Sequence, residues 1–116
     1  GKHVIVEKPI TQKSNEANDL VQLAKQKGVV LTVFQNRRWD GDFRTVQKVL
    51  GEAKFGRLIE FESHYDRYRT FITPNTWKEE GDEFAGVLYN LGSHMVDQVF
   101  VLFGKPKCYR LNKVLM

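Results

Sequence analysis

The sequence predicts a mixed α/β (α+β) fold, in which a parallel sheet is followed by part of a more open sheet that packs against a helix. Two short apolar runs, at residues 4–6 and 29–34, flank a stretch with helical spacing, which is the pattern of a strand–helix–strand unit. From Arg57 the apolar residues recur at every second position, as in a strand with one buried and one wetter face. The run at 87–103 is long, apolar and helical in period.

The chain has 116 residues, which is the size of one ordinary domain. Its 41% of hydrophobic and 28% of charged residues are typical of a soluble globular protein. The net charge of +4 comes from basic residues interleaved with acidic ones, so a nucleic-acid partner is not expected. No apolar run is long enough to span a bilayer, so we expect no membrane partner. The single cysteine, Cys108, fits a reducing compartment, and we expect a cytoplasmic location.

The two ends of the sequence indicate a segment of a longer protein. The first apolar run begins three residues after the start, and the chain closes on the apolar run 114–116 without a polar tail. Natural domains seldom begin and end inside strands, because termini usually lie frayed at the surface. We therefore expect the chain to be cut from a longer protein.

A helix is predicted between the first two strands. Ser14 or Asn15 can cap its N-terminus, and Gly28 can end it after Lys27, because glycine adopts the left-handed cap conformation without strain. Its inner face would consist of apolar residues at helical spacing, namely Ala17, Leu20, Val21 and Ala24. Two parallel strands joined in this way form a right-handed crossover.

A second helix is predicted over residues 43–50. Beyond it the apolar residues change from helical spacing to alternation, and the change falls near Gly56. We therefore predict a domain boundary there, which divides the chain into residues 1–56 and residues 57–116.

Charged and polar residues follow each strand of the predicted parallel pair. Glu7, Lys8 and Pro9 come after the first strand, and residues 35–39 come after the second. Ligands of open α/β sheets bind outside the carboxyl ends of the strands, so these residues are well placed for chemistry. The peptide bond before Pro9 is a candidate for the cis form. The alternative is that Glu7 and Lys8 form an ordinary surface ion pair.

The second part of the chain is predicted to contain two strands. One begins at Arg57, where apolar and polar residues alternate, and the other covers residues 108–114. Residues 70–86 have no sustained period, so they are predicted to form a long loop with one turn at Trp77.

The predicted helix over residues 87–103 has an apolar face and a polar stripe. Asn90, His94 and Gln98 recur four apart on the stripe, with Asp97 beside them, and a glycine and a proline after the helix predict its end. Two interpretations of His94 stay open: a core histidine bonded to a neighbour, or a functional group that the stripe presents. The apolar face is formed by Leu88, Leu91, Met95, Val99 and Leu102.

The sequence carries no motif for metal or phosphate binding. His3, His64 and His94 have no partners at a spacing that indicates zinc, so no metal is expected. No Gly-x-Gly-x-x-Gly, P-loop or nucleophile elbow occurs.

Three segments carry a resemblance to a known family. They are Gly1-Lys2-His3-Val4-Ile5-Val6-Glu7-Lys8-Pro9, the run 30–39, and Leu91-Gly92-Ser93-His94-Met95-Val96-Asp97-Gln98. In this order they resemble the Gfo/Idh/MocA family of NAD(P)-dependent oxidoreductases, over nearly all of the chain. The resemblance implies the end of a Rossmann-type parallel sheet, followed by part of an open, mostly antiparallel sheet with a packed helix.

The resemblance also implies an enzyme that oxidises or reduces hydroxyl and carbonyl groups with NAD or NADP. Lys8 and His94 would be catalytic, because hydride leaves a carbon only as the alcohol proton is taken up by a nearby base. Glu7, Lys8 and Pro9 would shape the cofactor crevice. The main phosphate-binding loop of such a cofactor site is absent from this sequence.

Asn90, Arg38 and Trp39 are predicted to bind a small sugar- or polyol-like substrate. Many family members carry aspartate where this chain has Asn90, and asparagine cannot accept a proton. The alternative is therefore a relative that keeps the fold without turnover and acts in binding, regulation or assembly. Family sheets often pair face to face, so we also expect a homo-oligomer formed through the sheet.

Overall fold

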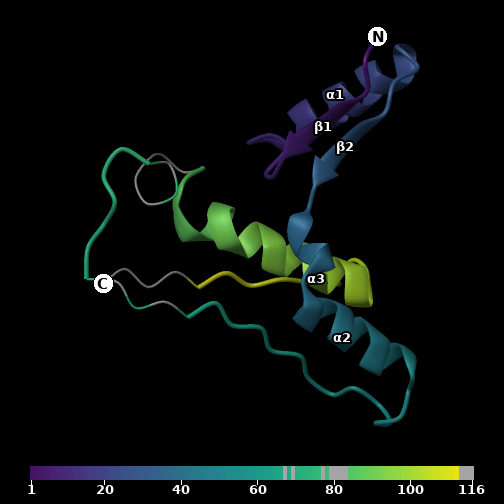
Figure 1. Cartoon of the computed structure of the whole chain (residues 1–116), viewed down its shortest axis with the longest axis vertical. Coiled ribbons are helices and arrows are strands. Elements are labelled where there is room, and N and C mark those ends of the chain that lie inside the picture. The colour runs from purple at the N-terminus through teal and green to yellow at the C-terminus, as the bar shows by residue number, and fades with distance from the viewer. Residues whose placement is uncertain (67, 69, 77, 79–83, 113–116) are drawn as a thin grey trace.

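The computed structural model describes residues 1–66, 68, 70–76, 78 and 84–112. The 3-10 turn η1 (Asn36–Trp39) and the π-helical turn η2 (Leu88–Gly92) each adjoin a longer helix. Helices and a small parallel sheet together confirm the predicted α/β class. The elements are, in order, β1 (Val4–Glu7), α1 (Ser14–Gln26), β2 (Leu31–Phe34), η1 (Asn36–Trp39), α2 (Gly41–Gly51), η2 (Leu88–Gly92) and α3 (Ser93–Phe103) (Figure 1).

The strands β1 and β2 pair in parallel, and α1 is the crossover between them, as predicted (Figure 1). Glu7 lies opposite Phe34 in the register, so both strands end at the same edge of the sheet. Continuous apolar runs such as these are typical of strands buried on both faces, and that expectation is wrong for the described residues. Ile5 is 72% exposed, and β2 alternates between half-buried and exposed residues, because a two-stranded sheet is covered on one face at most.

The helix α1 differs from its prediction at the cap and in burial. The cap is Lys13, whose backbone N–H donates to the Glu16 carboxylate at 3.2 Å, so the side chain three residues on satisfies a donor at the helix start. Leu20 and Val21 on the predicted inner face are 38% and 40% exposed. The narrow sheet leaves that face only partly covered.

The buried residues gather around α2 and the helix formed by η2 and α3. Phe43 of α2 and Leu91 of η2 are 4% and 6% exposed, and His94 of α3 is 6% exposed. The turn η1 contacts both α2 and α3, so it links the strand β2 to this region. No helix in the described part of the chain is long and apolar enough to cross a membrane.

The predicted helix over 87–103 is continuous but contains a widened turn. The backbone N–H of Ser93 bonds to the carbonyl of Leu88, five residues back, and the Ser93 hydroxyl donates to the carbonyl of Tyr89 at 2.9 Å. Such a π-helical turn is rare in proteins and often lies at a functional site. Leu88 is 49% exposed although Leu91 is buried, because the wider turn separates two residues that a regular helix would place on one face.

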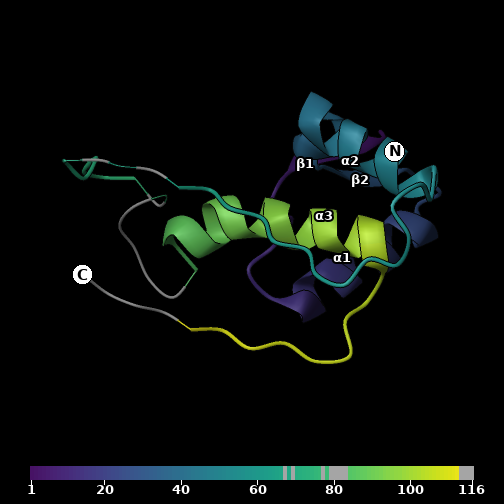
Figure 2. The same cartoon turned by 90° about the horizontal axis from the view of Figure 1, so that it is seen from below.

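The chain after α2 runs beside α3 without forming a strand in the described residues 57–66 (Figure 2). Side chains at 61–66 alternate between half-buried and exposed, and the Phe61 ring packs edge-on against Phe103 of α3, with centroids 5.3 Å apart. The alternation is as predicted, but a strand requires a hydrogen-bonded neighbour, and the described residues supply none. Residues 108–112 likewise form no strand, whereas 113–114 and the turn predicted at Trp77 lie outside the described residues.

Candidate active site

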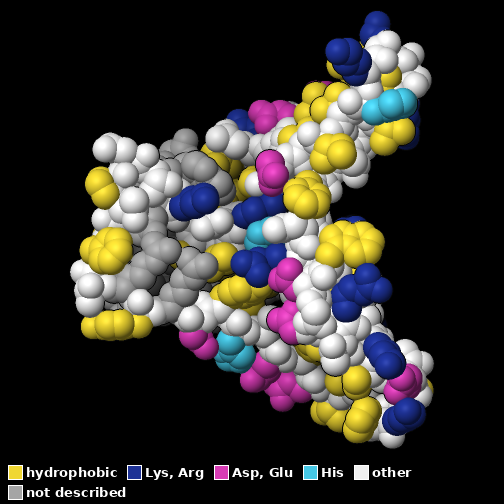
Figure 3. Space-filling model, viewed as in Figure 1, with side chains coloured by type: hydrophobic (Ala, Val, Ile, Leu, Met, Phe, Trp, Pro, Cys, Tyr) yellow, Lys and Arg dark blue, Asp and Glu magenta, His cyan; other side chains and the backbone are white. Residues whose placement is uncertain are grey.

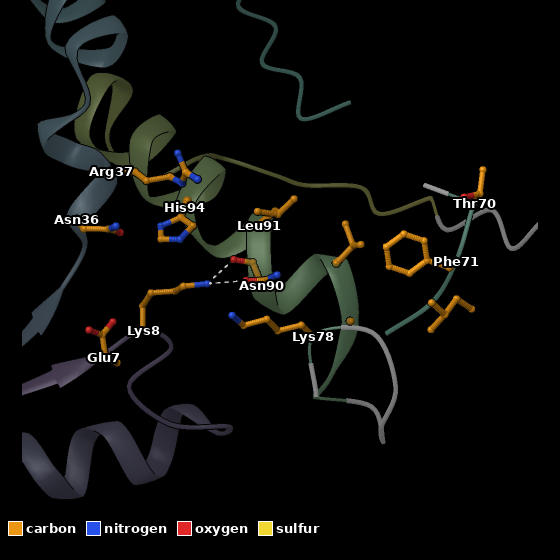
Figure 4. Close-up of a pocket in the computed structure, with 13 residues that line it drawn as sticks. Glu7, Lys8, Asn36, Arg37, Thr70, Phe71, Lys78, Asn90, Leu91 and His94 are labelled. Atoms are coloured by element: carbon orange, nitrogen blue, oxygen red, sulfur yellow. Dashed lines mark hydrogen bonds between the residues drawn. The ribbon is translucent and has the colours of Figure 1, made fainter. Parts of the chain in front are cut away.

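A cavity of about 1110 Å³ lies between the edge of the sheet and the η2–α3 helix. Figure 4 shows Lys8, Asn36 and His94 on one side of it and Phe71 on the other. In the space-filling view, basic side chains and a histidine gather over the middle of the molecule (Figure 3). The cavity therefore has a polar, mainly basic wall opposite an apolar one.

Lys8 reaches across this cavity from the end of β1 to η2. Its ammonium donates hydrogen bonds to the backbone carbonyl of Asn90 and to the side-chain Oδ1 of Asn90, the latter at 3.3 Å (Figure 4). Burial lowers the pKa of Lys8 below its ordinary value, and the charges of Lys78 and Arg37 lower it further, while Glu7 opposes them. The peptide bond between Lys8 and Pro9 is cis, as the sequence suggested.

His94 lines the cavity from the first turn of α3. Burial lowers the pKa of its imidazole, and the positive charges of Lys8 and Arg37 add to this, while Asp40 and Asp97 oppose it. The imidazole is therefore neutral at pH 7, with one nitrogen able to accept a proton. Its buried Nδ1 has no hydrogen-bond partner among the described residues, which supports a functional group over a core histidine bonded to a neighbour.

Arg38 and Trp39, two of the predicted substrate ligands, do not line this cavity. The Arg38 guanidinium makes two hydrogen bonds to the Asp97 carboxylate, at 2.7 and 2.6 Å. Trp39 is 69% exposed, and the Arg44 guanidinium lies 5.6 Å from the centroid of its ring.

Instead, η1 brings Asn36 and Arg37 to the cavity wall. The Arg37 guanidinium is bonded to Asp40 at 2.9 Å and lies 5.0 Å from the centroid of the Tyr65 ring. Sequence analysis identified the segment that contains these residues. Asn36 and Arg37 could not be selected within this segment, because neighbouring side chains in a tight turn point in different directions. No pattern in the sequence indicated that Lys78 would line the cavity.

Comparisons with known proteins identify the family of the chain. Residues 1–35 match an oxidoreductase family with an NAD-binding Rossmann fold, and residues 43–110 match the GFO/IDH/MocA C-terminal domain. The two matches together define the class of the chain, a family of oxidoreductases with an NAD-binding Rossmann fold. The chain belongs to the GFO/IDH/MocA family, as its sequence motifs indicated. The C-terminal match begins before Gly56, and the domain boundary at Gly56 stays a prediction.

Individual relatives are similar over most of the chain. It is 47% identical over 106 residues to the oxidoreductase C115.03 of Schizosaccharomyces pombe. The aligned residues cover 91% of this chain and 29% of that protein. It is 42% identical over 112 residues to scyllo-inositol 2-dehydrogenase (NADP(+)) IolW of Bacillus subtilis, covering 97% of the chain and 31% of that protein.

A solved structure gives the same result. The oxidoreductase YvaA from Bacillus subtilis superposes with a TM-score of 0.83 at 43% identity, over 92% of this chain and 30% of that one. The chain thus spans about 30% of the length of the relatives that it matches.

Proposed function

We propose that the full-length protein carrying this chain transfers hydride between NAD or NADP and a hydroxyl or carbonyl carbon of a small sugar- or polyol-like molecule. The observation that carries the proposal is that Lys8 and His94 line one cavity at the carboxyl edge of a parallel strand pair. Relatives named as oxidoreductases support the reaction class, and IolW, named as a scyllo-inositol dehydrogenase, supports a polyol as substrate.

The residues present fit the nicotinamide end of such a cofactor. Glu7, the last residue of β1, and Lys8, the next residue, line the cavity at the sheet edge where open α/β folds bind nucleotides, and Pro9 follows them. A volume of about 1110 Å³ is large enough for a ring and a small substrate side by side. When bound, the nicotinamide would supply or accept the hydride.

The side chains of this chain would handle the proton that accompanies hydride transfer. His94 is suited to accept it, because its lowered pKa leaves the imidazole neutral at pH 7. The Lys8 ammonium, held by Asn90, would contact the reacting oxygen and stabilise negative charge that develops there. Asn36 and Arg37 would hold further hydroxyl groups of the substrate from the same wall.

Steady-state kinetics of the full-length protein with scyllo-inositol and other polyols, using NAD and NADP in turn, tests this function. Lys8→Ala and His94→Ala should each lower kcat by about 100-fold or more. The KM for the cofactor should change little in His94→Ala. Lys25→Ala, which removes an exposed lysine of α1, is the matched control and should keep wild-type activity.

Three outcomes would contradict the proposal. Near-normal turnover in His94→Ala, or unfolding of this variant, would support the core-histidine interpretation. Absence of turnover in the wild type would support the alternative of a relative that keeps the fold for binding, regulation or assembly, which the asparagine at position 90 favours.

A further inference from the structure

Two sets of contacts join the helix η2–α3 to the sheet side of the cavity, one near the start of the helix and one near its middle. Near its start, Asn90 accepts hydrogen bonds from Lys8. One turn beyond His94, two consecutive residues of α3, Asp97 and Gln98, bond to the turn η1.

The second set of contacts has a defined geometry. The Asp97 carboxylate accepts two hydrogen bonds from the Arg38 guanidinium, at 2.6 and 2.7 Å, and a paired arrangement of this kind fixes orientation as well as distance. The side-chain amide of Gln98 donates to the backbone carbonyl of Arg37 at 3.1 Å. The Asp97 side chain is only 14% exposed, although Arg38 is half exposed. We call these contacts the η1–α3 latch.

The latch connects the sheet side of the candidate site to the helix that carries His94. The turn η1 follows β2, and β2 pairs with β1, which leads into Lys8. On the other side, Asp97 lies three residues after His94 on α3. The same turn carries Arg37 into the cavity, so a shift of η1 along α3 would move Arg37 and the sheet edge relative to His94.

We propose that Asp97 and Gln98 are positioning residues that hold η1 against α3 and so set the placement of His94 and Arg37 relative to Lys8. This deepens the proposed function and rests on it. Arg38, predicted as a substrate ligand, acts here as the partner of Asp97. The competing explanation is an ion pair that stabilises the fold and does nothing for the reaction.

The charges around His94 provide a second readout of the latch, beside the effect on kcat. Lys8 after β1, Arg37 of η1, Asp40 at the cap of α2 and Asp97 of α3 all act on the His94 imidazole. Neutralising Asp97 removes a negative charge near His94, whereas removing Arg38 leaves the charge of Asp97 unbalanced. The two changes break the same latch but act on His94 with opposite sign.

The experiment compares Asp97→Asn, Gln98→Ala and Arg38→Gln in the full-length protein. Each should lower kcat by about 10- to 100-fold with little change in the KM for the cofactor, because misplaced reacting groups slow the chemical step. Glu52→Gln, which breaks the exposed Lys54–Glu52 pair at 2.8 Å, is the matched control and should keep wild-type kcat. Unchanged kcat in the latch variants of an active enzyme would overturn the proposal.

An NMR titration of the His94 ring provides a readout that does not depend on turnover. The pKa of His94 should fall in Asp97→Asn and rise in Arg38→Gln, while Glu52→Gln leaves it unchanged. Shifts of the same sign in both latch variants, or none, would overturn the proposal. A wild-type protein without turnover would instead contradict the proposed function, and the titration would still decide whether the latch acts on His94.

Discussion

The ammonium of Lys8 bonds to two oxygens of Asn90, a residue that lies 82 positions further along the chain. Lys8 belongs to the segment that matches the NAD-binding Rossmann fold, and Asn90 belongs to the segment that matches the C-terminal domain. The contact therefore joins the two parts of the family fold directly at the cavity. It also places an uncharged side-chain oxygen beside the lysine.

Asn90→Asp should raise the pKa of both Lys8 and His94. The new carboxylate would lie within hydrogen-bond distance of the Lys8 ammonium and on the same cavity wall as His94, and a nearby negative charge favours the protonated form of each. The acid limb of the pH profile of kcat/KM should therefore move to higher pH. Asn18→Asp, which adds the same charge on the exposed face of α1, should leave the profile unchanged. An acid limb that stays in place would show that His94 does not control it.

The double variant Lys8→Ala/His94→Ala should lose much less activity than the product of the two single losses. Residues that act as one unit in proton transfer are not additive, since removing either one already disables the step. Steady-state kinetics of the four full-length proteins measures this. Multiplicative losses would indicate that the two residues act independently, even though they line one cavity.

The contribution of His94 to stability should decline as the solution becomes more acidic. Its folded-state pKa is lowered, mainly by burial, so between the unfolded value near 6.5 and the folded value the unfolded chain binds the proton more readily. The contribution is therefore fully present above about pH 6.5 and is lost as the pH falls through the folded pKa. Urea unfolding of the wild type and His94→Gln, from about pH 8 to about pH 4, measures the difference between them. A wild-type advantage that grows with acidity would contradict it.

The full-length protein should self-associate through the surface of the segment after Arg57, for which the sequence predicts a strand although the described residues 57–66 form none. Phe61 is covered by Phe103 of α3, whereas Ile59 is 77% exposed, so this segment has apolar surface left to bury. Light scattering at roughly tens of micromolar should show an oligomer, and Ile59→Lys should weaken it. Detection of monomer alone at this concentration would argue against assembly through this surface.

Short-range patterns in the sequence predicted much of this fold. The apolar runs and helical spacing identified the parallel pair, its crossover and the helix over 87–103, because these depend on residues only a few positions apart. The same patterns failed for the segment after Arg57. Its alternating burial is present, but a strand exists only when a second segment pairs with it.

The residues of the candidate site likewise fall into those that the sequence identified and those that only the tertiary structure brought to the cavity. The sequence by itself identified two candidate residues, Lys8 at the end of a strand and His94 on the polar stripe of a helix, and the family resemblance predicted their catalytic roles. Only the tertiary structure decided that η1 turns Arg37 into the cavity and Arg38 toward Asp97, and that the wide turn η2 presents Asn90 to Lys8. The reason is physical: periodicity follows from neighbours along the chain, whereas these contacts depend on how separate elements pack together.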